Sequence, residues 1–155
     1  MTIAERLAEL AITLPAPAAP LAAYVPVVEA DGMLYVSGQL PFRTDGSIIT
    51  GRLGVDCDAD QGREAAERCG IMVLAQLRAA LGGDLDRVER IVRLGVFVAS
   101  DPAFTDQPKV ANGASELMVQ VFGDAGRHAR SAVGVPVLPL NAAVEVDAVV
   151  AIRAA

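Results

Sequence analysis

Apolar positions follow a helical period in some stretches of the chain and a period of two in others, which predicts a mixture of helices and strands. The first stretch with helical spacing predicts a short helix over residues 3–11, and its apolar positions are Ile3, Leu7 and Leu10. Pro and Ala residues at 15–20 end that helix and indicate a rigid connector.

Strand-like runs follow at 25–29 and 33–38. Asp31 and Gly32 lie between them and favour a tight hairpin turn, because Gly tolerates positive φ. Gly38 stands at the end of the second run, where a glycine usually marks a bend or a close backbone approach.

The most regular helical pattern spans residues 58–81. Asp58 or Asp60 can cap its start, and the glycines at 82–83 can stop it. One stripe of small and apolar residues predicts the face that packs on a sheet: Ala66, Gly70, Val73, Leu77 and Ala80 or Leu81.

A strand and a second helix are predicted in the next part of the chain. Residues 87–99 alternate polar and apolar before becoming wholly apolar, as a central strand does when it enters a core. Within 107–123 the apolar residues return to helical spacing, Pro108 suits a first turn and Gly123 a last one, so a helix of about four turns is expected.

The segment 128–150 is predicted to form two strands joined by a short turn, yet it carries an arginine and two carboxylates. The period of two puts Arg130 on one strand face with Ala132 and Gly134. Glu145 and Asp147 share a face of the other strand, and antiparallel pairing could bring one of them beside Arg130. Two interpretations stay open: a structural cross-strand ion pair, or a small anion site in which Arg130 holds a carboxylate and Glu145 handles a proton.

The order of two strands, helix, strand, helix and two strands predicts an α+β two-layer sandwich, with one sheet and both helices on one face. We expect a single domain over residues 1–155, with an N-terminal extension at 1–20 and a body at 21–152. The apolar fraction of 53% is high for a monomer of this size. Some of this apolar surface is therefore expected in a subunit interface that covers the other face of the sheet.

Charge and composition exclude several function classes. A formal net charge of −6, a pI near 4.7 and an aromatic content of 4% without Trp argue against nucleic acid as a partner. No apolar run is long enough for a membrane span, and the N-terminus lacks the pattern of a signal peptide, so a cytoplasmic protein is expected.

The residue types also argue against several kinds of site. Cys57 and Cys69 stand alone, which fits neither a zinc site nor a disulfide framework. His128 is the only histidine, so a histidine-based triad is not expected, and a surface or loop position is predicted for it. No glycine-rich phosphate-binding motif occurs, and Ser131 points away from Arg130 and lacks a base.

Three pieces of the chain, "LYVSGQLP", "ARSAVGVPVLP" and "VEVDAVV", in this order and spacing, resemble the reactive-intermediate deaminase (Rid/YjgF) family, formerly endoribonuclease L-PSP. The resemblance covers about residues 20–152. The N-terminal extension and the longer stretch at 101–128 look like a longer-chain branch that is less clearly tied to one activity. The resemblance implies a chorismate-mutase-like fold with a mixed sheet, a homotrimer, and substrate clefts between neighbouring subunits.

The resemblance also implies an activity: hydrolysis of reactive enamines and imines, such as 2-aminoacrylate, to 2-keto acids and ammonia, with no metal or cofactor. The family's carboxylate-binding arginine falls on Arg130 and its water- or proton-handling glutamate on Glu145. Its substrate-contacting positions fall on Tyr24, Gly38, Asn112 and Ala132. Active members often have Cys where this chain has Ala132, so substrate preference can differ here.

Two alternatives to the deaminase are kept. A non-catalytic module could use the same cleft to bind a small carboxylic acid, and neither periodicity nor composition separates it from an enzyme. A ribonuclease, which the older family name suggests, is disfavoured by the acidic pI, the sparse aromatic residues and the lack of a histidine pair.

Overall fold

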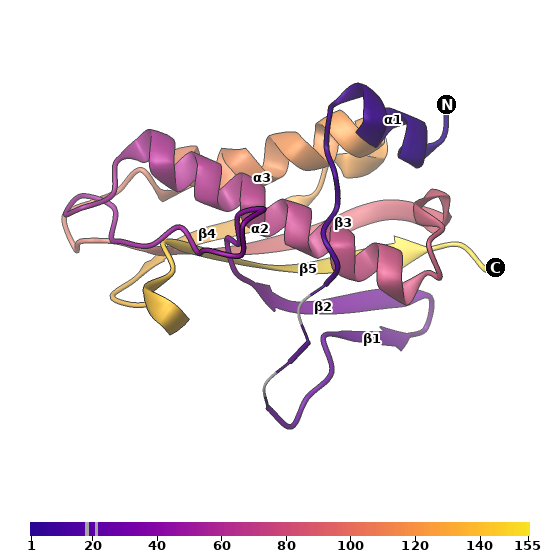
Figure 1. Ribbon diagram of the computed structural model, residues 1–155, viewed down its shortest axis with the longest axis horizontal. Helices are drawn as coiled ribbons and strands as arrows, with labels where there is room; N and C mark the ends of the chain where they lie inside the picture. Colours follow the sequence, from indigo (N-terminus) through magenta and orange to yellow (C-terminus); the bar gives the residue numbers. More distant parts are fainter. Residues whose placement is uncertain (18, 21) are drawn as a thin grey trace.

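Five strands form one mixed sheet in the order β1-β2-β5-β3-β4 in the computed structural model (Figure 1). The structure describes residues 1–17, 19–20 and 22–155. Neighbouring strands are antiparallel except β3 and β4, which are parallel. The strands are β1 (Val27–Ala30), β2 (Met33–Gln39), β3 (Val88–Ala99), β4 (Ala129–Val135) and β5 (Val144–Ile152).

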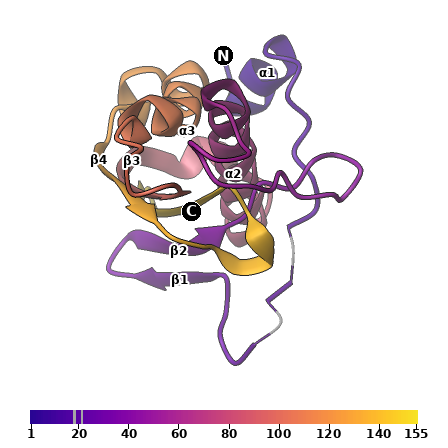
Figure 2. The ribbon, with the colours of Figure 1, turned by 90° about the vertical axis from the view of Figure 1, so that its left-hand side faces the viewer.

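Two long helices, α2 (Ala59–Ala80) and α3 (Gln107–Phe122), cover one face of the sheet, which confirms the predicted α+β two-layer sandwich (Figures 1 and 2). A third helix, α1 (Ile3–Glu9), packs against α3. Three short 3-10 helices complete the described elements: η1 (Leu85–Arg87), η2 (Gly123–Gly126) and η3 (Pro139–Asn141). Within the described ranges, no helix is both long and apolar enough to cross a membrane.

The predicted hairpin turn is present between β1 and β2. Asp31 and Gly32 have φ values of 50° and 74°, as a turn with two left-handed central residues requires. This turn sets the register in which Ala30 pairs with Met33. The sequence signal was strong because this turn type selects for Asp-Gly.

Helix α2 begins at the predicted cap. The Asp58 side chain accepts a hydrogen bond from the Gln61 N–H at 2.8 Å, and the Gln61 side chain accepts one from the Asp58 N–H at 2.9 Å. Residues 69–77 of this helix are all buried, so this stretch of α2 is covered on every side. Leu7 and Leu14 of the N-terminal segment belong to the same core cluster as these residues. The extension is therefore part of the domain core.

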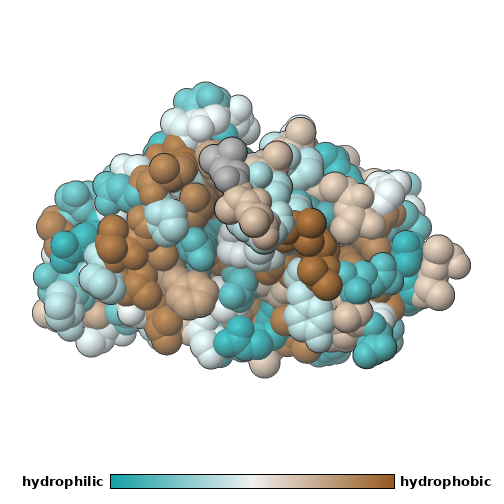
Figure 3. Space-filling view, turned by 90° about the horizontal axis from the view of Figure 1, so that it is seen from below, coloured by the Kyte–Doolittle hydropathy of each residue, from teal (hydrophilic) through white to brown (hydrophobic). Residues whose placement is uncertain are grey.

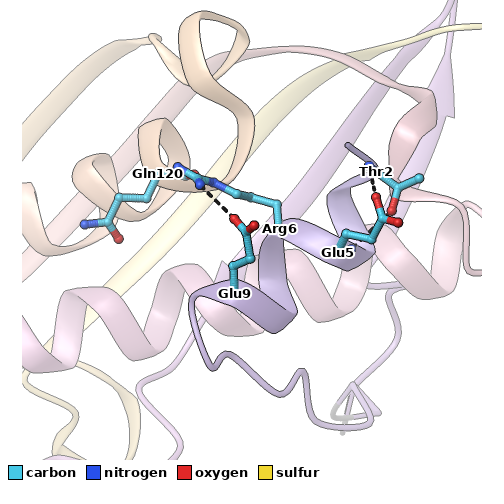
Figure 4. Close-up of polar contacts among 5 residues, drawn as sticks. All are labelled: Thr2, Glu5, Arg6, Glu9 and Gln120. Carbon is cyan, nitrogen blue, oxygen red and sulfur yellow. Dashed lines mark hydrogen bonds and ion pairs between the residues drawn. The ribbon is translucent and has the colours of Figure 1, made fainter.

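Polar contacts fix α1 to the rest of the domain (Figure 4). Thr2 and Glu5 form a capping box at its start. Arg6 donates from Nε to the Gln120 carbonyl oxygen of α3 at 2.8 Å and from Nη1 to Glu9 at 3.2 Å. The helix is short, so these contacts together with Leu7 hold it in place.

The predicted pairing of the last two strands is wrong. β3 lies between β4 and β5, so residues 128–150 do not form a hairpin. β4 returns parallel to β3 after α3, and the chain then crosses to place β5 between β2 and β3. A period of two identifies a strand and its faces but not its neighbours.

The sheet face opposite the two long helices is left open in the single chain. It carries exposed apolar side chains such as Tyr35, 49% exposed, and Val133, 46% exposed. Seen from below, apolar side chains form several patches between polar ones (Figure 3). This open face is where the sequence analysis expected a subunit interface.

Candidate functional site

Arg130 lies on edge strand β4 and points toward the helix layer. Its Nη1 donates to the Asn112 Oδ1 at 2.8 Å and to the Ser115 Oγ at 3.1 Å, and its Nη2 donates to the Pro108 carbonyl oxygen at 3.3 Å. All three acceptors belong to α3 and all are neutral. No carboxylate pairs with Arg130 among the described residues, so the cross-strand ion pair suggested by periodicity is wrong.

These contacts leave part of the guanidinium available. A guanidinium has five N–H donors, and the three hydrogen bonds to α3 use both Nη1 hydrogens and one Nη2 hydrogen. Within the described ranges, the Nε–H and the second Nη2–H of Arg130 have no partner. Two adjacent donors of this kind match the two oxygens of a carboxylate. Arg130 is thus held by neutral oxygens and keeps its charge for an anion.

His128 and Ser115 extend this arginine site, and the sequence analysis missed their role. The Ser115 Oγ lies 2.9 Å from the His128 Nε2, and the His128 Nδ1 lies 2.7 Å from the Gly126 carbonyl oxygen. A cavity of about 230 Å³ is lined by both residues together with Arg130. Burial, together with the Arg130 charge, holds the pKa of His128 below its usual value, despite the opposing effect of the hydrogen bond to the Gly126 carbonyl oxygen. The predicted loop position of His128 is correct, but the residue is half-buried and bonded.

The two residues that follow Arg130 on the same strand face have different surroundings. Ala132 is half-buried and packs against the main core. A Cβ on Gly134 would lie 2.7 Å from the Ser100 Oγ and 2.8 Å from the Gln107 Nε2. The small residues predicted in front of the arginine therefore make room for α3. A direct contact of Ala132 with substrate stays a prediction.

Glu145 lies on central strand β5 and points to the open face of the sheet. Its carboxyl group covers Gly38 of β2 so closely that a Cβ on Gly38 would lie 2.7 Å from the Glu145 Cδ. Burial, followed by the negative charge of Asp147, raises the pKa of Glu145. A half-buried carboxyl with a raised pKa is a candidate for proton transfer.

Asp147 occupies the next position on the same face. Its carboxyl group lies against Gly95 of β3 and 3.8 Å from the Arg93 Nη1. The prediction that Asp147 pairs with an arginine near the surface is confirmed. Glu145 and Asp147 thus each lie over a glycine of a neighbouring strand, and only Asp147 has a cationic partner among the described residues.

A cavity of about 310 Å³ lies at the end of β2, where Ser37, Gly38 and Gln39 line it. It contains two of the predicted substrate-contacting residues, Tyr24 and Gly38, and Tyr24 is 54% exposed. Most of its remaining lining is apolar: Ala19, Pro20, Pro26, Leu40, Phe42, Pro139 and Leu140, with Ser37, Gln39 and Gln76 as polar members. This cavity could hold the hydrocarbon part of a small ligand.

The predicted site residues thus form two groups that do not meet within one chain. Arg130 lies on the helix side of the sheet with Asn112, whereas Glu145 lies on the open side with Gly38. β3 separates their strands, which places β4 and β5 about 10 Å apart. The expectation that pairing brings Glu145 beside Arg130 is therefore wrong, and a small molecule cannot contact both side chains in one subunit.

Neither group has the composition of a metal site. In the part of the chain that the structure describes, no three His, Cys, Asp or Glu side chains gather closely enough to hold an ion. Cys57 and Cys69 are both free and buried. Burial, more than the charge of Glu145, raises the pKa of the Cys69 thiol, so this cysteine is an inert core residue as predicted.

Two comparisons with solved structures support the fold. The crystal structure of Atu1372 from Agrobacterium tumefaciens, a protein of unknown function, is 49% identical and covers 99% of this chain and 94% of its own, with a TM-score of 0.91. A Shewanella oneidensis MR-1 protein is 33% identical, covers 98% of this chain and all of its own, and has a TM-score of 0.93. Both similarities include the N-terminal extension.

Comparisons of the sequence identify the family. Protein TCP17 of Trypanosoma cruzi is 54% identical over 149 residues, which are 96% of this chain and 92% of that protein. Residues 4–151 match the family described as "YjgF/chorismate mutase-like, putative endoribonuclease". The sheet order, the two covering helices and this match confirm the chorismate-mutase-like fold. The chain belongs to the YjgF/chorismate mutase-like family.

Proposed function

We propose that this protein hydrolyses reactive 2-imino acids to 2-keto acids and ammonia. The observation that carries the proposal is that the chain has both an arginine with N–H donors left free and a half-buried glutamate whose pKa is raised. A 2-imino acid needs both, because its carboxylate must be held and its C=N carbon must receive water. A structure of Escherichia coli TdcF with bound serine, 25% identical over 92% of this chain with a TM-score of 0.60, also supports a small amino-acid-like ligand.

The proposed site lies between subunits. Arg130 and Glu145 face opposite sides of one sheet, so a ligand that contacts both must lie between two copies of the chain. The exposed apolar residues of the open face, including Tyr35 and Val133, supply a surface for such packing. We propose a homotrimer in which Arg130 of one subunit and Glu145 of a neighbour enclose one substrate.

The reaction assigns one role to each residue. Arg130 binds the substrate carboxylate through Nε–H and Nη2–H and fixes its orientation, each charge-assisted bond contributing about 1.5 to 3 kcal/mol. Water adds to the C=N carbon, and Glu145 takes a proton from that water and returns it to nitrogen. Glu145 then moves the remaining hydroxyl hydrogen to the amine nitrogen, the C–N bond breaks and ammonia leaves, so the carbonyl oxygen of the 2-keto acid comes from water. A proton relay of this kind contributes about 10² to 10⁴ in rate.

A non-catalytic binding protein for small carboxylic acids is the second candidate. One observation favours it: within the described ranges, Glu145 accepts no hydrogen bond that would orient its carboxylate for a water molecule. The arginine site, in contrast, is already ordered. This candidate retains the carboxylate contact of Arg130 and omits the chemical step.

The test measures imine hydrolysis in competition with a trap. An amino-acid oxidase generates 2-imino acids from several amino acids, semicarbazide traps them, and loss of the trapped product reports hydrolysis. Wild type is compared with Arg130→Ala, with Glu145→Gln and with Arg127→Ala, a matched control because Arg127 lines the same cavity but pairs with Asp124.

The deaminase proposal predicts that the Arg130 and Glu145 variants lose hydrolysis while the Arg127 variant keeps it. Sedimentation analysis should give three subunits for all four proteins. If the wild type fails to compete with the trap for any imine but still binds pyruvate, the binding role replaces the enzyme. If Arg130→Ala hydrolyses imines like wild type, Arg130 has no part in the site.

A further inference from the structure

A directed chain of hydrogen bonds runs from Arg130 through Ser115 and His128 to Gly126. Its direction follows from the chemistry of its ends, since an arginine only donates and a backbone carbonyl only accepts. The Gly126 carbonyl oxygen therefore receives the hydrogen on the His128 Nδ1 at 2.7 Å. In the neutral ring the Nε2 then has a free lone pair, which accepts the Ser115 hydroxyl hydrogen at 2.9 Å. The Ser115 oxygen is left to accept from the Arg130 Nη1 at 3.1 Å.

We propose that Ser115 and His128 are positioning residues that hold the Arg130 guanidinium in the orientation needed to bind a ligand carboxylate. This inference rests on the proposed function of Arg130. It adds two residues that the family comparison did not assign and that lie 13 positions apart, on α3 and directly before β4. His128 acts through Ser115 and touches neither ligand nor reacting atoms.

The arrangement explains why the serine needs the histidine. A serine hydroxyl within a helix commonly donates to the backbone carbonyl one turn earlier, and its direction is otherwise not fixed. When His128 takes this hydrogen, the lone pairs of the Ser115 oxygen turn toward the guanidinium. Together with Asn112 and Pro108, this oxygen fixes the plane of a side chain that is otherwise flexible. A planar two-donor edge binds a carboxylate well only when its plane is set in advance.

The charges around His128 favour the neutral ring that this role requires. Arg130 lies two residues further on, in β4, and Arg127 directly precedes His128 beside the same cavity, where it pairs with Asp124 of η2. Glu116 of α3, one residue beyond Ser115, pairs with Arg63. On β3, Arg90 donates to the Arg127 carbonyl. Of these charges, that of Arg130 lowers the pKa of the His128 ring, so a positive charge on His128 would be repelled by it.

The first arm of the test reads the hydrogen-bond direction directly. His128 is the single histidine of the chain, so its ring gives one unambiguous set of NMR signals. Long-range ¹H–¹⁵N correlation of wild type at neutral pH should show a neutral ring with its hydrogen on Nδ1. Ser115→Ala should shift the Nε2 resonance. A ring with its hydrogen on Nε2 would overturn the inference, because Ser115 would then have to donate elsewhere.

The second arm measures pyruvate binding, which does not depend on catalysis. Ser115→Ala and His128→Ala should each weaken the binding of pyruvate about tenfold, the effect of losing one hydrogen bond to a charged group. His128→Gln should recover most of this loss, because the Gln oxygen can accept from Ser115. Ser131→Ala is the matched control, because Ser131 points away from the site on the opposite face of β4. In imine hydrolysis the same variants should raise KM more than they lower kcat.

The outcomes separate this inference from the proposed function. If Arg130→Ala abolishes pyruvate binding while Ser115→Ala and His128→Ala bind like wild type, Arg130 keeps its role and the positioning pair is refuted. If His128→Gln is as weak as His128→Ala, the histidine acts only as packing and the inference also fails. If wild type binds no pyruvate and hydrolyses no imine, the proposed function fails together with the need for positioning.

Discussion

The close approach of the Glu145 carboxyl group to Gly38 gives a direct test of which acid carries the chemistry. Gly38→Ala would place a Cβ 2.7 Å from the Glu145 Cδ and 3.0 Å from its Cγ. Carbon atoms in ordinary contact are about 3.5 to 4.0 Å apart, so the carboxyl group has to move by about 1 Å. Displacing a reacting group by this distance can lower the rate about 10²-fold.

Gly95→Ala is the matched control. It would place a Cβ 3.0 Å from the Asp147 Cγ and 3.1 Å from the Arg93 Nη1, and so moves the other acid by a similar amount. Overpacking at either site should cost about 1 to 3 kcal/mol in the free energy of unfolding. The two variants therefore match in stability and differ in which carboxyl group they displace.

The assay is kcat/KM for imine hydrolysis at neutral pH, with melting temperatures measured in parallel. We expect Gly38→Ala to lose about two orders of magnitude and Gly95→Ala to stay close to wild type. Equal losses in the two variants would mean that Glu145 has no special role. Full activity in Gly38→Ala would mean that the carboxyl group works from a position other than the one seen here.

Three further predictions concern stability. Burial and Asp147 raise the pKa of Glu145, so its ionised form opposes folding once the pH exceeds the pKa of this group in the unfolded chain. Glu145→Gln should therefore raise Tm at pH 7 and have no effect below about pH 4. A Cβ on Gly113 would collide with the Arg63 carbonyl group, so Gly113→Ala should separate α2 from α3 and cost about 3 kcal/mol or more in urea denaturation. Asp58→Ala removes the α2 capping box and should cost about 1 kcal/mol in the same assay, and a loss near zero would show that the helix start is held by tertiary contacts alone.

The elements that could be predicted are those with local signals. The cap of helix α2 at Asp58 and the glycines with positive φ at 82–83 could be predicted, because each depends only on residues close in sequence. The turn at Asp31 and Gly32 is local in the same sense. For Arg130, the period of two correctly predicted that it shares a strand face with the small residues Ala132 and Gly134.

The features that could not be predicted depend on which strands are neighbours. No local pattern indicates that β3 lies between β4 and β5. This position of β3 is the reason why Arg130 and Glu145 lie at separate sites. The Ser115–His128 contact was missed for a related reason. A serine in a helix and a histidine before a strand are both common, and only the crossover from α3 to β4 brings them together.

The position of β5 in the sheet has a consequence for how the chain folds during synthesis. β5 is the last strand in chain order and the central strand in space, and β2 and β3 have no direct pairing across the gap it fills. Until β5 has left the ribosome, β2 and β3 lack the strand that pairs with both of them, and each presents an open edge. Such edges invite wrong pairing with other chains. We therefore expect the domain to fold only after synthesis has passed Ile152, with a rate limited by this long-range insertion.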